Sequence, residues 1–420
     1  MSQDDKIIQL ARELGIEVEK SPFDSRGAHR DTLARLWLDD KGKINKDIHN
    51  ISLILENDPT FKSLCFDPHA NRNLWKGERM EDRHVTQIRR DLIVRYGMRS
   101  TKKDIEDAMI MVASTRQHEP IKDFLQSLKW DGTERIARLL TDVFYAETLP
   151  AWEHLIQRMG LNWFVSCVAR IYEPGCKADT CLVLVSPKGY KKGTSFKILA
   201  GDKWFSDSDL DISGKKGLEK LHQSGKWIWE FAEMKSFQGR TAETAKAFLT
   251  SGSDLYRAPY ARNPIDAKRR TVFCASTNNY QFLTDGAERR FYPVTLTDRI
   301  NLEYLRTNRD QIWAEAVELY KTGYQWWFDV EELKDGSFYD WEAALARYQM
   351  CYIVDDPWAG DVAEYLDLPT TTKATNSKIF DFLSIPHAQR SRNLTIRMGE
   401  ICRSLGYDLT GSNPRYWTKK

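Results

Sequence analysis

Several familiar signals are missing from this chain of 420 residues. Its seven cysteines are scattered and include no C-x-x-C pair, which argues against a zinc site or a disulfide framework and favours a reducing compartment. Apolar runs such as LVLV at 182–185 are far too short to span a bilayer, and the charged N-terminal stretch lacks the apolar segment of a signal peptide. We therefore expect an intracellular protein without a membrane partner.

The chain also lacks a strong charge of either sign, since 62 Lys and Arg and 60 Asp and Glu give a formal net charge of +2. Any contact with nucleic acid would have to come from local basic patches. Tryptophan, by contrast, is abundant, and its 14 residues indicate packed, ordered domains. The length is sufficient for roughly two to four domains with a sizeable core.

The hydrophobic pattern divides the chain into four regions. We expect a mostly helical N-terminal domain at 1–105, a helical collar or linker at 106–175, an α/β core at 176–330 and a C-terminal tail at 331–420. In the core, short apolar segments alternate with helical ones, which is the rhythm of a sheet covered by helices. The expected strands are 181–185, 226–232, 271–276 and 291–295.

The segment after the first expected strand resembles a phosphate-binding loop. An apolar strand runs into a turn rich in Gly and Lys, and the turn runs into a helical segment, which is the context that such a loop needs. Against the pattern G-x-x-x-x-G-K-[ST], Lys192 keeps the lysine position. Ser186 and Lys191 take the two glycine positions, and Gly193 takes the Ser/Thr position. The alternative is a basic turn that binds no nucleotide.

Each part of the loop has a chemical role to fill. Backbone N–H groups at a helix start and a lysine ammonium attract phosphate, and a hydroxyl holds Mg²⁺. Lys192 fits the ammonium role, and Thr194 fits the hydroxyl role if the loop shifts its register. Lys191 brings a Cβ to a position where glycine permits a left-handed backbone. The residues expected at ATP and Mg²⁺ are Pro187, Lys188, Gly189, Lys191, Lys192, Gly193 and Thr194.

Three further segments could complete the site. The second expected strand carries Glu230 and is followed by Glu233, and the two could hold Mg²⁺ and activate water if the chain bends between them. Asn278 follows the third strand and could sense the terminal phosphate. Arg289 and Arg290 precede the fourth strand and could reach a neighbouring subunit's phosphate as an arginine finger. Each feature alone also fits surface decoration or an ordinary turn, so their order is the stronger indication.

Six segments in this order resemble the virulence-associated protein E family. They are EPIKDFLQSLKWDGTERI, VARIYEPGCKADTCLVL, GKWIWEFAEM, KAFLTSGSDLYRAPYAR, TVFCASTNN and GAERRFYPV. Members are P-loop proteins of phages, prophages and mobile islands, similar to superfamily 3 helicases. The resemblance implies an α/β ASCE-type P-loop core and assembly as a hexameric ring. It also implies an ATP-dependent DNA helicase or replication initiator in the cytoplasm of a bacterial host.

The resemblance also assigns roles to residues of this chain. It implies that Lys192 is the phosphate lysine, that Glu230 and Glu233 are the acidic pair, and that Asn278 is the sensor. Arg289 or Arg290 would be the finger. No primase-type centre is apparent at 1–105, so a separate primase is an expected partner.

Single-stranded DNA would thread the ring and contact a hairpin between the acidic strand and the Asn-ended strand. Basic side chains interleaved with tyrosine suit phosphate contact and base stacking. Local packing of Arg257 to Arg262 is the alternative. The candidates are Arg257, Tyr260, Arg262, Lys268, Arg269 and Arg270.

The loop departs from the family pattern, which is close to GPQGTGKST, whereas this chain has SPKGYKKGT. The loss of the Mg²⁺ hydroxyl leaves a second interpretation open, namely a non-hydrolysing DNA-binding or regulatory protein on the same fold. A toxin or effector ranks last, because the sequence shows neither a secretion signal nor an effector-like active site. The matching residues are Pro187, Gly189, Lys192 and Thr194.

The end of the chain predicts a small winged-helix-like domain after a polar linker at 369–376. The sequence from 377 to 420 reads as helix, turn, helix and short hairpin, and its eight Lys or Arg oppose three acids. A basic helix in such a domain commonly reads duplex DNA. A basic cap on the core is the alternative. The candidate DNA contacts are Arg390, Arg392, Arg397 and Arg415.

Overall fold

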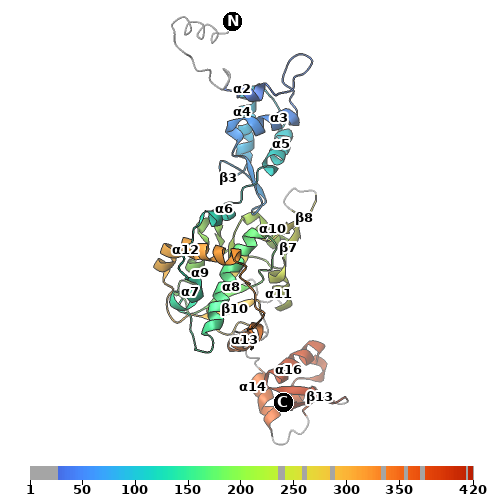
Figure 1. The fold of residues 1–420 in the computed structure, drawn as a ribbon. Coiled ribbons are helices and arrows are strands. Elements are labelled where there is room, and N and C mark those ends of the chain that lie inside the picture. The colour runs from blue at the N-terminus through green and yellow to red at the C-terminus, as the bar shows by residue number, and fades with distance from the viewer. Residues whose placement is uncertain are drawn as a thin grey trace. The chain divides into compact units, whose positions relative to one another are not determined.

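The computed structural model describes residues 27–234, 242–257, 263–283, 289–332, 337–353, 358–368, 374–412 and 415–419. The chain forms two compact units, Met1–Asn278 with Arg289–Glu342, and Asn279–Glu288 with Ala343–Lys420. The expected mixed α/β class is confirmed, because helices accompany a parallel five-stranded sheet (Figure 1). None of the helices within the described ranges combines the length and the apolar character that a membrane crossing requires.

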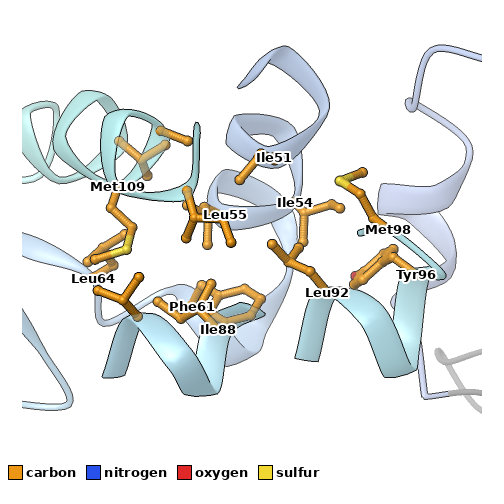
Figure 2. Packing of buried hydrophobic residues seen from close by; sticks show 14 of the residues in the cluster. Ile51, Ile54, Leu55, Phe61, Leu64, Ile88, Leu92, Tyr96, Met98 and Met109 are labelled. Carbon is orange, nitrogen blue, oxygen red and sulfur yellow. The ribbon is translucent and has the colours of Figure 1, made fainter. Parts of the chain in front are cut away.

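The first part of the larger unit is a helical domain with a small antiparallel sheet. Its elements are α2 (Arg30–Leu33), α3 (Ile48–Asn57), η1 (Pro59–Phe61), β1 (Cys65–Asp67), β2 (Arg72–Trp75), β3 (Glu78–Arg79), α4 (Asp82–Tyr96) and α5 (Lys102–Ser114). Apolar side chains of α3, α4 and α5, among them Ile51, Leu92 and Met109, pack together in its core (Figure 2). Because α5 contributes to this core, the chain has no break at the expected boundary after residue 105.

A parallel sheet with the order β10-β4-β9-β6-β5 forms the centre of the larger unit. Its strands are β4 (Cys181–Val185), β5 (Phe205–Ser206), β6 (Ile228–Ala232), β9 (Val272–Thr277) and β10 (Phe291–Thr295). The four expected strands are all present. Only β5 was missed, because two residues carry no readable pattern. β4 is buried at every position, as befits a central strand of a parallel sheet.

Helices cover both faces of this sheet. They are α6 (Pro120–Ser127), α7 (Ile136–Asp142), α8 (Glu153–Tyr172), α9 (Lys192–Ala200), η2 (Asp202–Trp204), α10 (Lys215–Ser224), α11 (Ala242–Thr250) and α12 (Leu302–Lys321). Trp163 of α8 and Phe196 of α9 pack with ring centroids 5.8 Å apart, and α12 packs against both helices. On the other face, Phe248 of α11 packs 5.2 Å from Phe273 of β9.

Two hairpins accompany the sheet. β7 (Ser253–Tyr256) and β8 (Ile265–Lys268) pair antiparallel between α11 and β9. This is the place at which the sequence predicts a DNA-contacting hairpin. β11 (Val330–Glu332) and β12 (Phe338–Asp340) form the second one.

The smaller unit carries the end of the chain. Its elements are most of α13 (Trp341–Gln349), then η4 (Met350–Tyr352), α14 (Ala359–Asp367), α15 (Asn376–Phe382), η5 (His387–Gln389), α16 (Arg392–Ser404), β13 (Tyr407–Thr410) and β14 (Tyr416–Lys419). From α15 onward this is the helix, turn, helix and hairpin expected from the sequence. Ile379, Met398 and Trp417 belong to its apolar core, so the hairpin packs on the helices.

Candidate functional site

The candidate site lies at the carboxyl edge of the sheet, where β4 and β9 end. The chain leaves β4 toward β5 at one side of the sheet, whereas it leaves β9 toward β10 on the other side of β4. Ligands of open α/β sheets bind outside the carboxyl ends of strands whose connections diverge in this way. The turn after β4 and Asn278 after β9 therefore lie where a ligand is expected.

The Lys192 ammonium is folded into this turn. Nζ donates to the carbonyl oxygens of Ser186 (2.7 Å) and Pro187 (3.2 Å), to Oγ of Ser186 (3.0 Å) and to Oδ1 of Asn278 (3.0 Å). Burial lowers the pKa of Lys192, and the nearby carboxylates of Glu233 and Glu230 oppose that shift. All four acceptors are neutral, so none of the groups bonded to the ammonium cancels its charge.

At Lys191 the turn has a backbone conformation that glycine usually adopts. Lys191, directly before α9, has φ 70° and ψ 22°, which is the left-handed conformation. Gly189 also has a positive φ, of 93°. A left-handed backbone costs a residue with a Cβ roughly 1–2 kcal/mol, so Lys191 holds the shape of the loop under strain.

Glu230 lies on β6 and is buried, with 3% of its surface exposed. Oγ of Ser276 donates to its Oε1 at 2.5 Å. Burial raises the pKa of Glu230, and the hydrogen bond from Ser276 opposes that shift. Ser276 was missed in the sequence, where its one signal is its position near the end of β9, two residues before Asn278.

Glu233 reaches the site because the chain turns sharply after β6. Glu233 and Met234 both have a positive φ, of 53° and 52°. Nδ2 of Asn278 donates to Oε1 of Glu233 at 2.8 Å. Lys192, Asn278 and Glu233 thus form one continuous chain of hydrogen bonds across the ends of three strands.

The first turn of α9 separates two neighbouring residues. Gly193 faces Glu230, because a Cβ added to Gly193 would lie 2.7 Å from Oε2 of that carboxylate. Thr194 instead lines a hollow of about 630 Å³ together with Trp204 and Arg309. The register shift that would bring the Thr194 hydroxyl to a metal beside Glu230 is therefore not seen. Pro187, Lys188 and Gly189 are exposed on the outside of the loop.

Arg289 and Arg290 lie at the opposite edge of the sheet from Lys192. They precede β10, whose first residue, Phe291, pairs with Cys181 at the start of β4. Nη1 of Arg289 lies 3.0 Å from Oε1 of Glu342, and Nε of Arg290 donates to Oγ1 of Thr250 at 2.7 Å. A strand of five residues spans about 16 Å, so neither arginine reaches the loop of its own chain.

The β7–β8 hairpin presents two of the expected DNA contacts. Arg257 and Lys268 are exposed. Tyr260 and Arg262 lie outside the described residues.

The prediction that Arg269 and Arg270 contact DNA is wrong, because both side chains are paired with carboxylates of this chain. Arg269 is 1% exposed, and its Nε and Nη2 bind the two carboxylate oxygens of Asp254 at 2.6 and 2.7 Å. Nε2 of His222 lies 2.9 Å from the same carboxylate. Arg270 is paired with Glu119. The carboxylates lie far enough away in the sequence that the basic run alone did not reveal these pairs.

The C-terminal candidates differ in accessibility. Arg392 and Arg415 are exposed. Arg397 is half-buried, with its guanidinium 3.8 Å from the centroid of the Trp358 ring. The side chain of Arg390 is 11% exposed, pairs with Asp381 and donates to the carbonyl oxygen of Ile385 at 2.8 Å. Arg390 thus holds the turn before α16 together.

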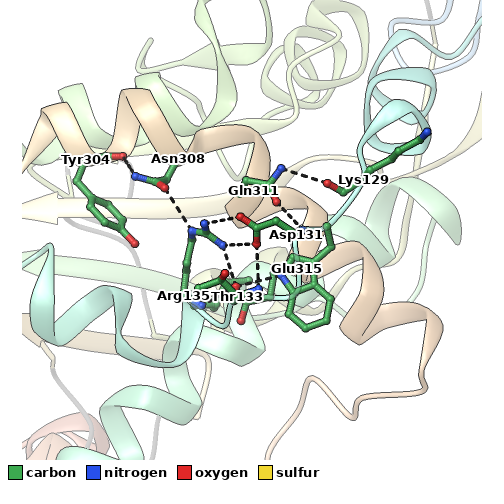
Figure 3. Close-up of polar contacts among 10 residues, drawn as sticks. Lys129, Asp131, Thr133, Arg135, Tyr304, Asn308, Gln311 and Glu315 are labelled. Atoms are coloured by element: carbon green, nitrogen blue, oxygen red, sulfur yellow. Dashed lines mark hydrogen bonds and ion pairs between the residues drawn. The ribbon is translucent and has the colours of Figure 1, made fainter.

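The segment WDGTERI fastens α7 to α12 (Figure 3). Asp131 accepts two hydrogen bonds from the Arg135 guanidinium, at 2.8 and 2.7 Å, and these hold the pKa of Asp131 well below its usual range. Glu315 of α12 accepts from the backbone N–H groups of Arg135 (2.7 Å) and Ile136 (3.0 Å) at the start of α7. This segment, which belongs to one of the six that carry the family resemblance, therefore has a structural role.

Comparisons with known proteins agree with the sequence resemblance. A family model described as the virulence-associated protein E-like domain matches residues 125–337, just over half of the chain. No curated protein matches the chain.

Among solved structures, the apo A form of the NrS-1 C-terminal region is similar at 13% identity and a TM-score of 0.44, covering 89% of this chain and 100% of that chain. A further apo structure of this region has 12% identity and a TM-score of 0.46, covering 89% of this chain and 99% of that one. The family model includes the loop, the acidic strand, Asn278 and both arginines. The chain belongs to the virulence-associated protein E-like family.

Proposed function

We propose that this chain is a P-loop ATPase that binds Mg²⁺ and ATP at the ends of β4 and β9 and acts on DNA in the replication of a phage or mobile element. The observation that carries this proposal is the position of the Lys192 ammonium. It lies inside a turn between a buried strand and a helix, and Asn278 connects it to Glu233. These are the parts that phosphoryl transfer to water requires.

Each residue has a definite part in this proposal. Phosphate oxygens would replace the carbonyl oxygens of Ser186 and Pro187 as acceptors for Lys192. Asn278 would orient the terminal phosphate, and Glu233 would accept a proton from the attacking water. Asn278 already positions the Glu233 carboxylate by its hydrogen bond.

The carboxylates present fit a magnesium ion held together with a nucleotide. A bound Mg²⁺ would neutralise negative charge on the phosphates during phosphoryl transfer. Protein sites usually supply it with one or two carboxylates, while phosphates and water complete the shell. Among the described residues no group of three or more His, Cys, Asp or Glu could hold a metal by itself. Glu230, a single buried carboxylate beside the loop, suits the shared kind of site.

The arginines favour a site shared between subunits. Because Arg289 lies at the other edge of the sheet, it would serve the loop of a neighbouring copy, and the chain would act as a ring, which we propose is a hexamer. Single-stranded DNA in the ring would contact Arg257 and Lys268 of the hairpin. Arg392 and Arg415 of the tail would contact duplex DNA. A separate primase would supply primers.

A second function is favoured by the loop itself. Gly193 has no hydroxyl for a metal, and Lys191 is strained. A protein that binds DNA and nucleotide without turnover would tolerate both features. The unbroken series of hydrogen bonds from Lys192 through Asn278 to Glu233 favours the ATPase.

The experiment is ATP binding and steady-state hydrolysis with and without single-stranded DNA, for the unmodified chain, Lys192→Ala, Glu233→Gln and the control Lys216→Ala, which changes an exposed lysine of α10. We expect Lys192→Ala to lose binding, Glu233→Gln to bind without turnover, and the control to behave normally. Binding without turnover in the unmodified chain would establish the second function. No binding at all would overturn both nucleotide roles.

A further inference from the structure

The carboxylate of Glu230 fills the space beside α9 that a side chain at Gly193 would need. A Cβ added to Gly193 would lie 2.7 Å from Oε2 and 3.2 Å from Oε1 of Glu230. The first of these distances is shorter than real Cβ contacts. Position 193 is where the loop pattern has serine or threonine, so the usual side chain would require the Glu230 carboxylate to move from the place it has here.

Glu230 is held in this place from the sheet side. Oγ of Ser276 donates to its Oε1 at 2.5 Å, and the backbone of Glu230 is paired with Cys274 in the sheet. Among the described residues none donates a hydrogen bond to Oε2, the oxygen nearest to Gly193. One carboxylate oxygen is thus anchored, and the other faces the first turn of α9.

The length of the side chain decides whether this contact exists. An aspartate at position 230 would be shorter by one carbon–carbon bond, about 1.5 Å, and its carboxylate would withdraw from Gly193. Glutamate at position 230 therefore fits glycine at position 193. An aspartate at position 230 would leave room for a larger residue at position 193.

We propose that Glu230 and Gly193 are a matched pair, in which the glutamate carboxylate takes over the metal-ligand position of the absent loop hydroxyl. This rests on the proposed function, because the metal is the Mg²⁺ of a bound nucleotide. Carboxylate oxygen is a ligand that Mg²⁺ accepts readily. The missing hydroxyl then marks a changed ligand set rather than a lost one.

The test is a double-mutant cycle with Gly193→Ser, Glu230→Asp and the two combined. The measurements are the affinity for a fluorescent ADP analogue with and without Mg²⁺, the number of Mn²⁺ ions bound per chain by electron paramagnetic resonance, and the melting temperature. Gly360→Ser is the matched control, because this helical glycine has nothing within 4 Å of an added Cβ.

We expect each single variant to lose Mg²⁺-dependent affinity by about tenfold or more. Gly193→Ser would push Glu230 aside, and Glu230→Asp would leave a gap. The double variant would recover to within about threefold of the unmodified chain, since contacting residues couple. Gly360→Ser would bind as the unmodified chain does.

In one outcome, the unmodified chain binds nucleotide while the two losses of affinity multiply in the double variant. That result would overturn the matched pair and leave the proposed function unaffected. An unmodified chain that binds no nucleotide would overturn the proposed function and this ligand assignment together. If the melting temperature shows that Gly193→Ser does not fold, Gly193→Ala adds the Cβ alone. Its rescue by Glu230→Asp is expected, and failure of that rescue would overturn the pair.

Discussion

Lys192 and Asn278 meet through a 3.0 Å hydrogen bond between Nζ and Oδ1, although 86 positions separate them in the chain. The amide of Asn278 therefore has one end on the loop lysine and the other on Glu233. Any anion that draws Lys192 away frees Oδ1 while Nδ2 still holds the carboxylate. Asn278 is thus placed to relate occupancy of the loop to the position of Glu233, the proposed general base.

Asn278→Ala is expected to reduce turnover much more than binding. Loss of a preorganised polar group at a reacting centre typically costs roughly 10²–10³ in kcat. Lys192 and its loop remain, so nucleotide affinity should change by only a few fold. Single-turnover and binding measurements on the same preparation separate the two effects. Equal losses in both would show that Asn278 only supports the loop.

Lys191→Gly is expected to stabilise the protein. Glycine adopts the left-handed backbone without the cost of roughly 1–2 kcal/mol, but it loses more entropy on folding, so the net gain is at most about 1 kcal/mol. Lys197→Gly is the matched control, because Lys197 is an exposed residue within α9, and it should destabilise by about 1 kcal/mol. Denaturant unfolding measures both, and destabilisation by Lys191→Gly would contradict the strain assigned to this residue.

Arg289→Ala and Lys192→Ala are expected to complement each other. Each variant alone should lack ATPase activity if the finger acts between subunits. In a mixed assembly, some interfaces pair an intact loop with an intact arginine from the neighbour, so mixing should restore part of the turnover. The measurement is phosphate release against mixing ratio. Mixtures that stay inactive, although light scattering shows assembly, would rule out a shared site.

The Asp254–Arg269 pair is expected to make stability depend on pH in acid. Burial alone would raise the pKa of Asp254, but hydrogen bonds from His222 and Arg269 outweigh it and lower the pKa from 3.8 to about 2. A carboxyl with a depressed pKa stabilises the fold above its unfolded value and loses this contribution as the pH falls. The contribution should therefore be complete above about pH 4 and decline toward pH 2.

Asp254→Asn should accordingly destabilise by about 3–5 kcal/mol at pH 6, because Arg269 would stay buried without its partner. The difference from the unmodified chain should narrow as the pH falls below about 4. Asp266→Asn, an exposed change on the same hairpin, should shift stability by less than about 0.5 kcal/mol. A constant difference across this pH range would contradict the assignment.

Arg257→Ala and Lys268→Ala are expected to weaken binding of single-stranded DNA regardless of its sequence. Each lost phosphate contact should reduce the slope of log K against log salt by about 1. Arg392→Ala and Arg415→Ala should act on duplex DNA instead. Fluorescence anisotropy at several salt concentrations measures both, with Lys43→Ala as an exposed control. Slopes of log K against log salt that stay unchanged in Arg257→Ala and Lys268→Ala would show that the hairpin does not contact single-stranded DNA.

The sequence predicted local structure around the candidate site where neighbouring residues carry the information. Four strands, the turn into α9 and the bend before Glu233 all follow from residues that are close together in the chain. The sequence marked Lys191 as a non-glycine residue at a position where glycine permits a left-handed backbone, and the structure has that backbone there.

Contacts between distant segments were beyond such reasoning. The burial of Arg269 depends on Asp254 from the paired strand, and the approach of Glu230 to Gly193 depends on how α9 lies against β6. The position of Thr194 depends on the residue at which the helix begins. Each is set by packing in three dimensions rather than by the spacing of residues along the chain.

The separation of Arg289 from Lys192 across the depth of the sheet has a quantitative consequence. No side-chain motion spans about 16 Å. The loop of one copy therefore lacks an arginine, and the arginine of that copy lacks a loop, until a second copy binds at the proposed shared site. Dilution should then switch turnover off even with saturating ATP, and the rate per chain should rise with protein concentration. In a cell, the number of copies made would set a threshold below which the protein stays idle.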